Sequence, residues 1–332
     1  MASDSLTTML KAVRGYGGPT HNDLINAAMR GDDQTAERLF ALYDPRPAPF
    51  DLRYPLQIAA WGEDFSMAEK VSRSQARPTN AEPIRLEGHL NLVELFVAQG
   101  RWRAAAVQLD RAADLDPERA RLNRAVMATL PFLSIPRDDL ESVMEDLQRW
   151  APPVPEQGSP PERAYDQQVR LYFMGLLSSK LGDATRALEY ADAIEGLPDV
   201  VGTPVPGGLA TTIRADAAWR QGSASVVVLR ALEPLQGHLP AVLWDHPAFG
   251  QEHARYVRAS ALQQAGENDE ALRWLEDTFK LTPGRVYYLA PTQYLAAQAF
   301  DASGRTEEAA EPRAKYRELW ADADEGIVLP GG

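Results

Sequence analysis

Apolar and small residues recur every three or four positions over most of the chain, and glycine or proline interrupts this pattern at intervals. The clearest stretch, residues 86–117, predicts an amphipathic helix, a turn at Gly100 and a second helix. The second helix carries Ala105 and Leu109, and Pro117 ends it. Because small side chains at helical spacing allow two antiparallel helices to approach closely, the pattern predicts a helix–turn–helix unit.

The same unit recurs along the chain, each time with a glycine between two helical stretches. The best further copies cover residues 167–198 and 252–283, where Ala187 and Ala271 stand at the position of Ala105. Seven glycines are expected to form the turns: Gly31, Gly62, Gly100, Gly182, Gly222, Gly266 and Gly304.

Neighbouring turn glycines are 31 to 44 residues apart, except for an 82-residue gap between Gly100 and Gly182. Residues 118–153 predict a divergent helix pair within this gap, with Ile135 and Pro136 in the connection. With that pair included, the mean spacing is 39 residues, which implies eight helix pairs.

This unit resembles the tetratricopeptide repeat, whose ideal length is about 34 residues. The resemblance covers residues 21–323 and implies an all-α solenoid, a right-handed superhelix of about eight antiparallel helix pairs. Residues 1–20 are then expected to form a flexible leader, and residues 324–332 a C-terminal tail.

The C-terminal third contains, in order, the stretches HARYVRASALQQAGENDEALRWLE, VYYLAPTQYLAAQAFDASGRTEEAAE and KYRELWADAD. They resemble the tetratricopeptide modules at the C-termini of bacterial serine/threonine kinases and of multidomain transcriptional regulators. The sequence contains no kinase glycine loop and no HRD or DFG segment. The resemblance therefore implies a stand-alone sensor or scaffold module.

In tetratricopeptide proteins the first helix of each pair lines a concave groove, so the resemblance implies a binding site on these helices. Tyrosine and tryptophan are common in binding sites because they combine a large apolar area with a polar group. The alternative is that the aromatic side chains pack between repeats in the core. Counting from the turn glycines gives the expected groove residues: Leu90, Glu94, Tyr172, Leu176, Trp219, Tyr256, Tyr294 and Gln298. The same count places Lys180, Asp216 and Asp301 on these helix faces.

Co-chaperones with tetratricopeptide domains hold a terminal carboxylate with lysine, asparagine and arginine at groove positions. Here Leu90, Glu94, Tyr172 and Leu176 stand at those positions. This difference argues against recognition of an EEVD-like tail.

The charge of the chain restricts its partners. The sequence has 34 basic and 47 acidic residues, a net charge of −13, which argues against a general binder of nucleic acid or anionic membrane. No apolar run has the length of a membrane-spanning helix, so we expect a cytoplasmic protein without membrane insertion.

Candidate catalytic chemistry is sparse. Without cysteine the chain has no thiolate zinc site and no cysteine nucleophile, and GYGGPT lacks the lysine of a phosphate loop. The five histidines do not form a HExxH motif, so we expect neither a metal nor a cofactor: His21, His89, His238, His246 and His253.

We expect a non-enzymatic scaffold or accessory subunit that binds a protein or an extended peptide in its groove. A regulatory sensor that binds a small molecule or signalling peptide is the first alternative. An enzyme built as an α/α toroid is the second, with Asp245 and His246 in its best candidate loop. The repeat spacing is short for a toroid, and the acidic stretch 138–146 is typical of a solvated helix face. The sequence predicts neither the partner's identity nor the oligomeric state.

Overall fold

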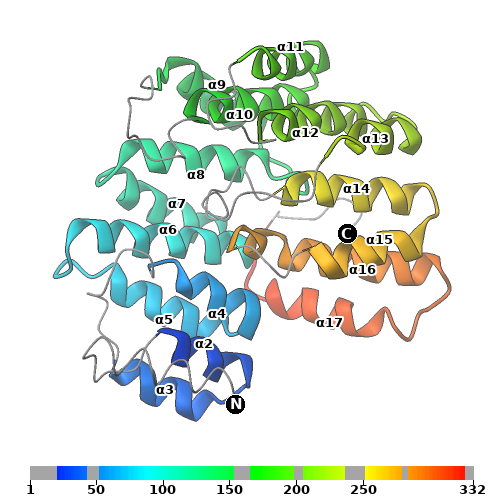
Figure 1. Ribbon diagram of the computed structural model, residues 1–332. Helices are drawn as coiled ribbons and strands as arrows, with labels where there is room; N and C mark the ends of the chain where they lie inside the picture. The colour runs from blue at the N-terminus through cyan, green and yellow to red at the C-terminus, as the bar shows by residue number, and fades with distance from the viewer. Residues whose placement is uncertain are drawn as a thin grey trace. The chain divides into compact units, whose positions relative to one another are not determined.

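The computed structural model describes residues 21–42, 52–152, 165–197, 205–235, 251–278 and 283–325, and these ranges contain helices and no strand (Figure 1). The all-α fold class is therefore confirmed for the described part of the chain. The expected leader at residues 1–20 and the loop with Asp245 and His246 lie outside the described residues. Within the described ranges, no helix is both long and apolar enough to cross a membrane.

The chain divides into two compact units. The described residues within 1–97 and 102–117 form the first unit, and those within 98–101 and 118–332 form the second. The first unit contains these described helices, except for the last residue of α6: α2 (His21–Met29), α3 (Asp33–Ala41), α4 (Tyr54–Gly62), α5 (Phe65–Gln75), α6 (Glu82–Ala98) and α7 (Trp102–Ala113). Those of the second are α8 (Pro117–Thr129), α9 (Arg137–Arg149), α10 (Asp166–Lys180), α11 (Ala184–Glu195), α12 (Val205–Arg220), α13 (Ser225–Leu232), α14 (Glu252–Gln264), α15 (Asn268–Thr278), the 3-10 helix η4 (Pro283–Tyr288), α16 (Leu289–Ala302) and α17 (Ala310–Leu319).

Helices α8 and α9 lie within the 82-residue gap between turn glycines, where the sequence predicts a divergent helix pair. Their connection lacks a glycine and contains the buried side chains of Phe132 and Leu133. A search for turn glycines therefore does not find this connection.

Six of the seven expected turn glycines have a left-handed backbone, with φ between 63° and 87°. The expected turn at Gly62 is wrong by one residue, because Glu63 takes the left-handed conformation with φ of 55°. Gly62 instead ends α4 against α2, where an added Cβ would lie 2.6 Å from the Cβ of Ala28. A close helix contact, and not a turn, requires this glycine.

An aspartate follows several of these left-handed residues and begins the second helix. Asp32, Asp64 and Asp183 each accept a hydrogen bond from the backbone N–H three residues later, at 2.8 to 3.0 Å. This N-cap satisfies one of the backbone donors that a helix N-terminus leaves unpaired. The turn and the start of the second helix are thus specified by two adjacent residues.

In the second unit, α10, α12 and α14 each pack on their own partner helix and on the first helix of the next pair. Helix α10 contacts α11 and α12, α12 contacts α13 and α14, and α14 contacts α15 and α16 (Figure 1). Ala105, Ala187 and Ala271 are fully buried on the second helices, as their place in the repeat predicts. In the first unit α2 packs on α3 and α4 in the same way.

Candidate functional site

The eight expected groove residues differ in burial. Five of them are at most 5% exposed, namely Leu90, Glu94, Tyr172, Leu176 and Tyr256. Trp219, Tyr294 and Gln298 are partly exposed. Leu90 and Glu94 belong to the first unit and the other six to the second. Tyr172, Leu176 and Tyr256 lie in a buried cluster, Tyr294 and Gln298 line an open hollow, and Trp219 packs against the core formed by α12, α13 and α14. Partner contact by these residues stays a prediction.

Glu94 on α6 has a partner inside the first unit. Its carboxylate accepts a hydrogen bond from the guanidinium of Arg53, just before α4, at 2.5 Å. Nearby, the Asn91 side-chain amide donates to the backbone oxygen of Leu52 at 2.7 Å and to the Gln75 amide oxygen at 3.0 Å. A buried carboxylate needs such a partner because removing it from water is costly. Glu94 therefore holds α6 to the start of α4.

An aromatic cluster fills the space beside α10 and α14 in the second unit. The ring of Tyr256 lies edge-on to that of Phe132, with centroids 5.5 Å apart, and Phe132 meets Tyr288 in the same way at 5.4 Å. Edge-to-face contacts of this kind stabilise a core beyond the area that they bury. Phe132 comes from the α8–α9 connection and Tyr288 from η4, so segments far apart in sequence meet Tyr256.

A buried carboxylate lies at the polar end of this cluster. Asp216 on α12 accepts hydrogen bonds from the Ser179 hydroxyl at 2.6 Å, the His253 Nε2 at 2.8 Å and the Arg220 Nε at 2.9 Å. Burial acts to raise the pKa of Asp216, but Arg220 and His253 outweigh it and hold the pKa below its usual range. Ser179 and His253 bond to different oxygens of Asp216 and not to each other, so this is not the arrangement of a nucleophilic triad.

Lys180, at the end of α10, links this cluster to α8. Its ammonium group donates to the backbone oxygens of Ala128 and Leu130, at 2.8 and 2.9 Å. Burial lowers the pKa of Lys180 to about 7, and the neighbouring Arg220 acts in the same direction. Lys180 therefore caps the C-terminal carbonyl groups of α8.

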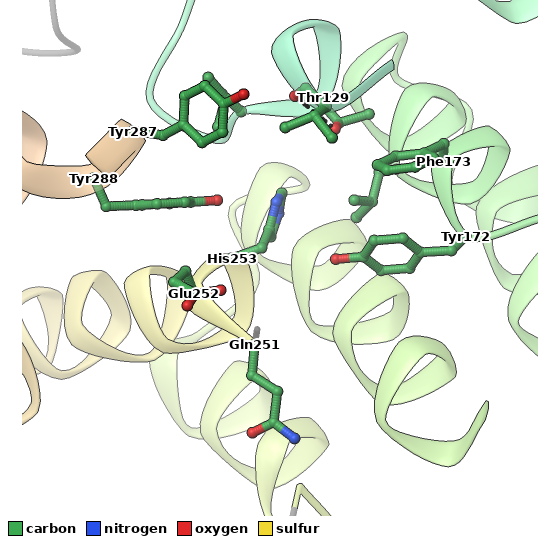
Figure 2. A pocket seen from close by; sticks show the side chains of 11 residues that line it. Thr129, Tyr172, Phe173, Gln251, Glu252, His253, Tyr287 and Tyr288 are labelled. Carbon is green, nitrogen blue, oxygen red and sulfur yellow. Dashed lines mark hydrogen bonds between the residues drawn. The ribbon is translucent and has the colours of Figure 1, made fainter. Parts of the chain in front are cut away.

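The cavity beside this cluster is small. Figure 2 shows the hydroxyls of Tyr172 and Tyr288 directed toward each other from opposite sides, with the His253 ring between them. The cavity has a volume of about 20 Å³ and is also lined by Thr129 and Glu252. This volume suits about one water molecule. The cluster therefore organises the core of the second unit and leaves no room for a larger ligand.

A larger hollow lies between α16 and α17 and has a volume of about 240 Å³. From α16 it is lined by Tyr294, Ala297, Gln298 and Asp301, and from α17 by Arg313, Tyr316 and Arg317. The rings of Tyr294 and Tyr316 are 5.3 Å apart, and Arg313 forms an ion pair with Asp301 across the hollow. Burial raises the pKa of both tyrosines, which keeps their hydroxyls protonated.

Counting from the turn glycines predicts the α16 side of this hollow and misses the α17 side. Tyr294, Gln298 and Asp301 follow from counting along the first helix, whereas the count ignores second helices. Arg313, Tyr316 and Arg317 could have been found from their spacing, because residues three and four apart share one face of a helix.

No protein-family model and no curated protein sequence matches this chain. Within the described residues, no three histidine, aspartate or glutamate side chains are grouped so that they could hold a metal ion.

Proposed function

We propose that this chain is a tetratricopeptide-like interaction protein that binds a segment of a partner protein in the hollow between α16 and α17. The repeated helix–glycine–helix pairs, and the contacts between successive first helices, support stacking of the pairs into a right-handed solenoid. Such stacks present first-helix residues along one surface, and Tyr294 and Gln298 are residues of that kind.

The observation that carries the proposal is the combination of side chains in the hollow. Two partly exposed tyrosines lie beside an amide and two guanidinium groups in a space of about 240 Å³. Tyrosine and arginine are the residue types that most often contribute binding energy at protein interfaces. The space is smaller than the roughly 300–1,000 Å³ of drug-sized ligand sites, so it suits one or two side chains of a bound segment.

The alternative functions are less well supported by the geometry. The cavity beside His253 has a volume of about 20 Å³, which is too small for an organic signalling molecule. In the same cluster Asp216 already accepts three side-chain hydrogen bonds, which suits a role in holding helices together better than proton transfer. The proposal therefore assigns no reaction to this cluster.

A random-peptide display library, selected on the purified chain, would supply ligands for a direct test. We expect Tyr294→Ala and Tyr316→Ala each to weaken binding of a selected peptide by about 30-fold, the equivalent of ~2 kcal/mol for an interface hot spot. Tyr190→Ala is the matched control, because Tyr190 is a partly buried tyrosine on α11 that lies outside the hollow. Unchanged affinity in both hollow variants, with correct folding shown by their melting curves, would reject the proposed site.

A further inference from the structure

We infer that the hollow between α16 and α17 recognises an acidic protein segment, in which an aspartate or glutamate carboxylate pairs with Arg317. This inference rests on the proposed function and adds the chemistry of the partner. It concerns a site on the last helix pair, away from the groove positions at which co-chaperones hold a terminal carboxylate.

The charges that line the hollow are not balanced. Among the described residues that line it, Asp301 is the one acidic residue, and Arg313 pairs with it. Arg317 is exposed on the same face of α17, and within the described part of the chain it has no ion pair or side-chain hydrogen bond. A guanidinium group is therefore available to a ligand, on a chain whose net charge is −13.

The groups around Arg317 fit a carboxylate on a peptide better than an isolated anion. A guanidinium group can donate two parallel hydrogen bonds to one carboxylate. The Gln298 amide and the tyrosine hydroxyls on the same hollow supply further donors, and the paired rings of Tyr294 and Tyr316 offer apolar area to the residue beside the carboxylate. An acidic side chain next to an apolar or aromatic one is thus the expected pattern.

Other charged segments fit less well. A basic segment would meet Arg317 and would have to compete with Arg313 for Asp301. A phosphorylated segment usually requires a cluster of arginines, and here one of the two guanidinium groups is already paired. An acidic unphosphorylated segment is therefore the occupant that the charges favour.

The probes for the test are synthetic peptides of equal length, built on one aromatic residue flanked by Glu, Gln, Lys or phosphoserine, and measured by fluorescence anisotropy against the full chain. We expect the Glu peptide to bind and the Gln peptide to bind about tenfold more weakly. Arg317→Glu should weaken binding of the Glu peptide by about tenfold or more and improve binding of the Lys peptide.

Arg230→Glu provides the matched control. Arg230 is also an exposed arginine in the last turn of a helix of the second unit, so both substitutions change the net charge and the helix terminus alike. We expect it to leave the affinity for the Glu peptide unchanged. Equal loss in Arg230→Glu and Arg317→Glu would overturn the inference, since a general charge effect would explain both.

The remaining outcomes separate the two proposals. Equal binding of the Glu and Gln peptides, or a preference for the Lys or phosphoserine peptide, would overturn the acidic chemistry while the hollow remained a binding site. Failure of all four peptides and of the display library to bind would overturn the site as well.

Discussion

Tyr256 and Tyr294 occupy equivalent places in the repeat, yet their surroundings differ. Tyr256 is 5% exposed because Phe132 and Tyr288 cover it, whereas Tyr294 is partly exposed beside Tyr316. Helical spacing predicts the face on which each tyrosine lies, because that face depends only on neighbouring residues. It does not predict which distant segment covers the face, so the sequence alone left both tyrosines as candidates.

Substituting these two tyrosines should show, from the loss in the free energy of unfolding, that Tyr256 belongs to the core and that Tyr294 is partly exposed. Tyr256→Ala removes a buried ring and should lower the free energy of unfolding by about 3–5 kcal/mol. Tyr294→Ala should lower it by less than about 1.5 kcal/mol, because its ring is only partly buried. Urea unfolding followed by circular dichroism measures both, and an equal loss in the two variants would show that the assigned difference in burial is incorrect.

Lys180 should make stability depend on pH. Its folded pKa is about 7, whereas an unfolded lysine has a pKa of about 10.4. Between these values the unfolded chain binds more protons, so the free energy of unfolding contributed by this group rises as the pH rises. Lys180→Met removes the titration. Chemical denaturation from pH 7 to 10 should therefore show wild type gaining stability relative to Lys180→Met, and a constant difference would contradict the lowered pKa.

Where the individual helices begin and end is largely predictable from the sequence. Turn glycines act on their immediate neighbours, so their effect can be recognised without knowledge of distant residues. Pro117, which is expected to end the second helix of its unit, instead begins α8, after α7 has ended at Ala113. Gly62 shows the limit, since its contact with Ala28 of α2 depends on packing between two helices. The 3-10 helix η4 and the covering role of Phe132 are likewise set by tertiary contacts and were not predicted.

The small residues at the helix contacts provide a test of the repeat register. Ala105→Leu, Ala187→Leu and Ala271→Leu should each lower the free energy of unfolding by about 1–3 kcal/mol, because all three sites are fully buried and closely packed. Ala106→Leu on α7 and Ala193→Leu on α11 are controls at exposed positions of two of these helices and should change it little. If the variants at the buried positions and the variants at the exposed positions lowered the melting temperature equally, the assignment of these alanines to the repeat would be wrong.

At the scale of the whole molecule, the proposed stack of helix pairs predicts an elongated particle. A compact globular chain of 332 residues would have a radius of gyration of about 20 Å. Small-angle X-ray scattering should give a clearly larger value with an asymmetric distance distribution. A radius near that of the compact chain would count against an extended solenoid, without affecting the contacts described within each unit.

The most direct test of the proposed function is a cross-linking measurement at the hollow. A photoreactive p-benzoylphenylalanine is placed at position 294 or, as the control, at position 190, and each protein is irradiated with the acidic peptide bound. We expect the peptide to be attached at position 294 and not at position 190, with attachment reduced when Arg317→Glu is present. Equal attachment at both positions, or none at position 294 under conditions where the peptide is bound, would contradict binding in the hollow between α16 and α17.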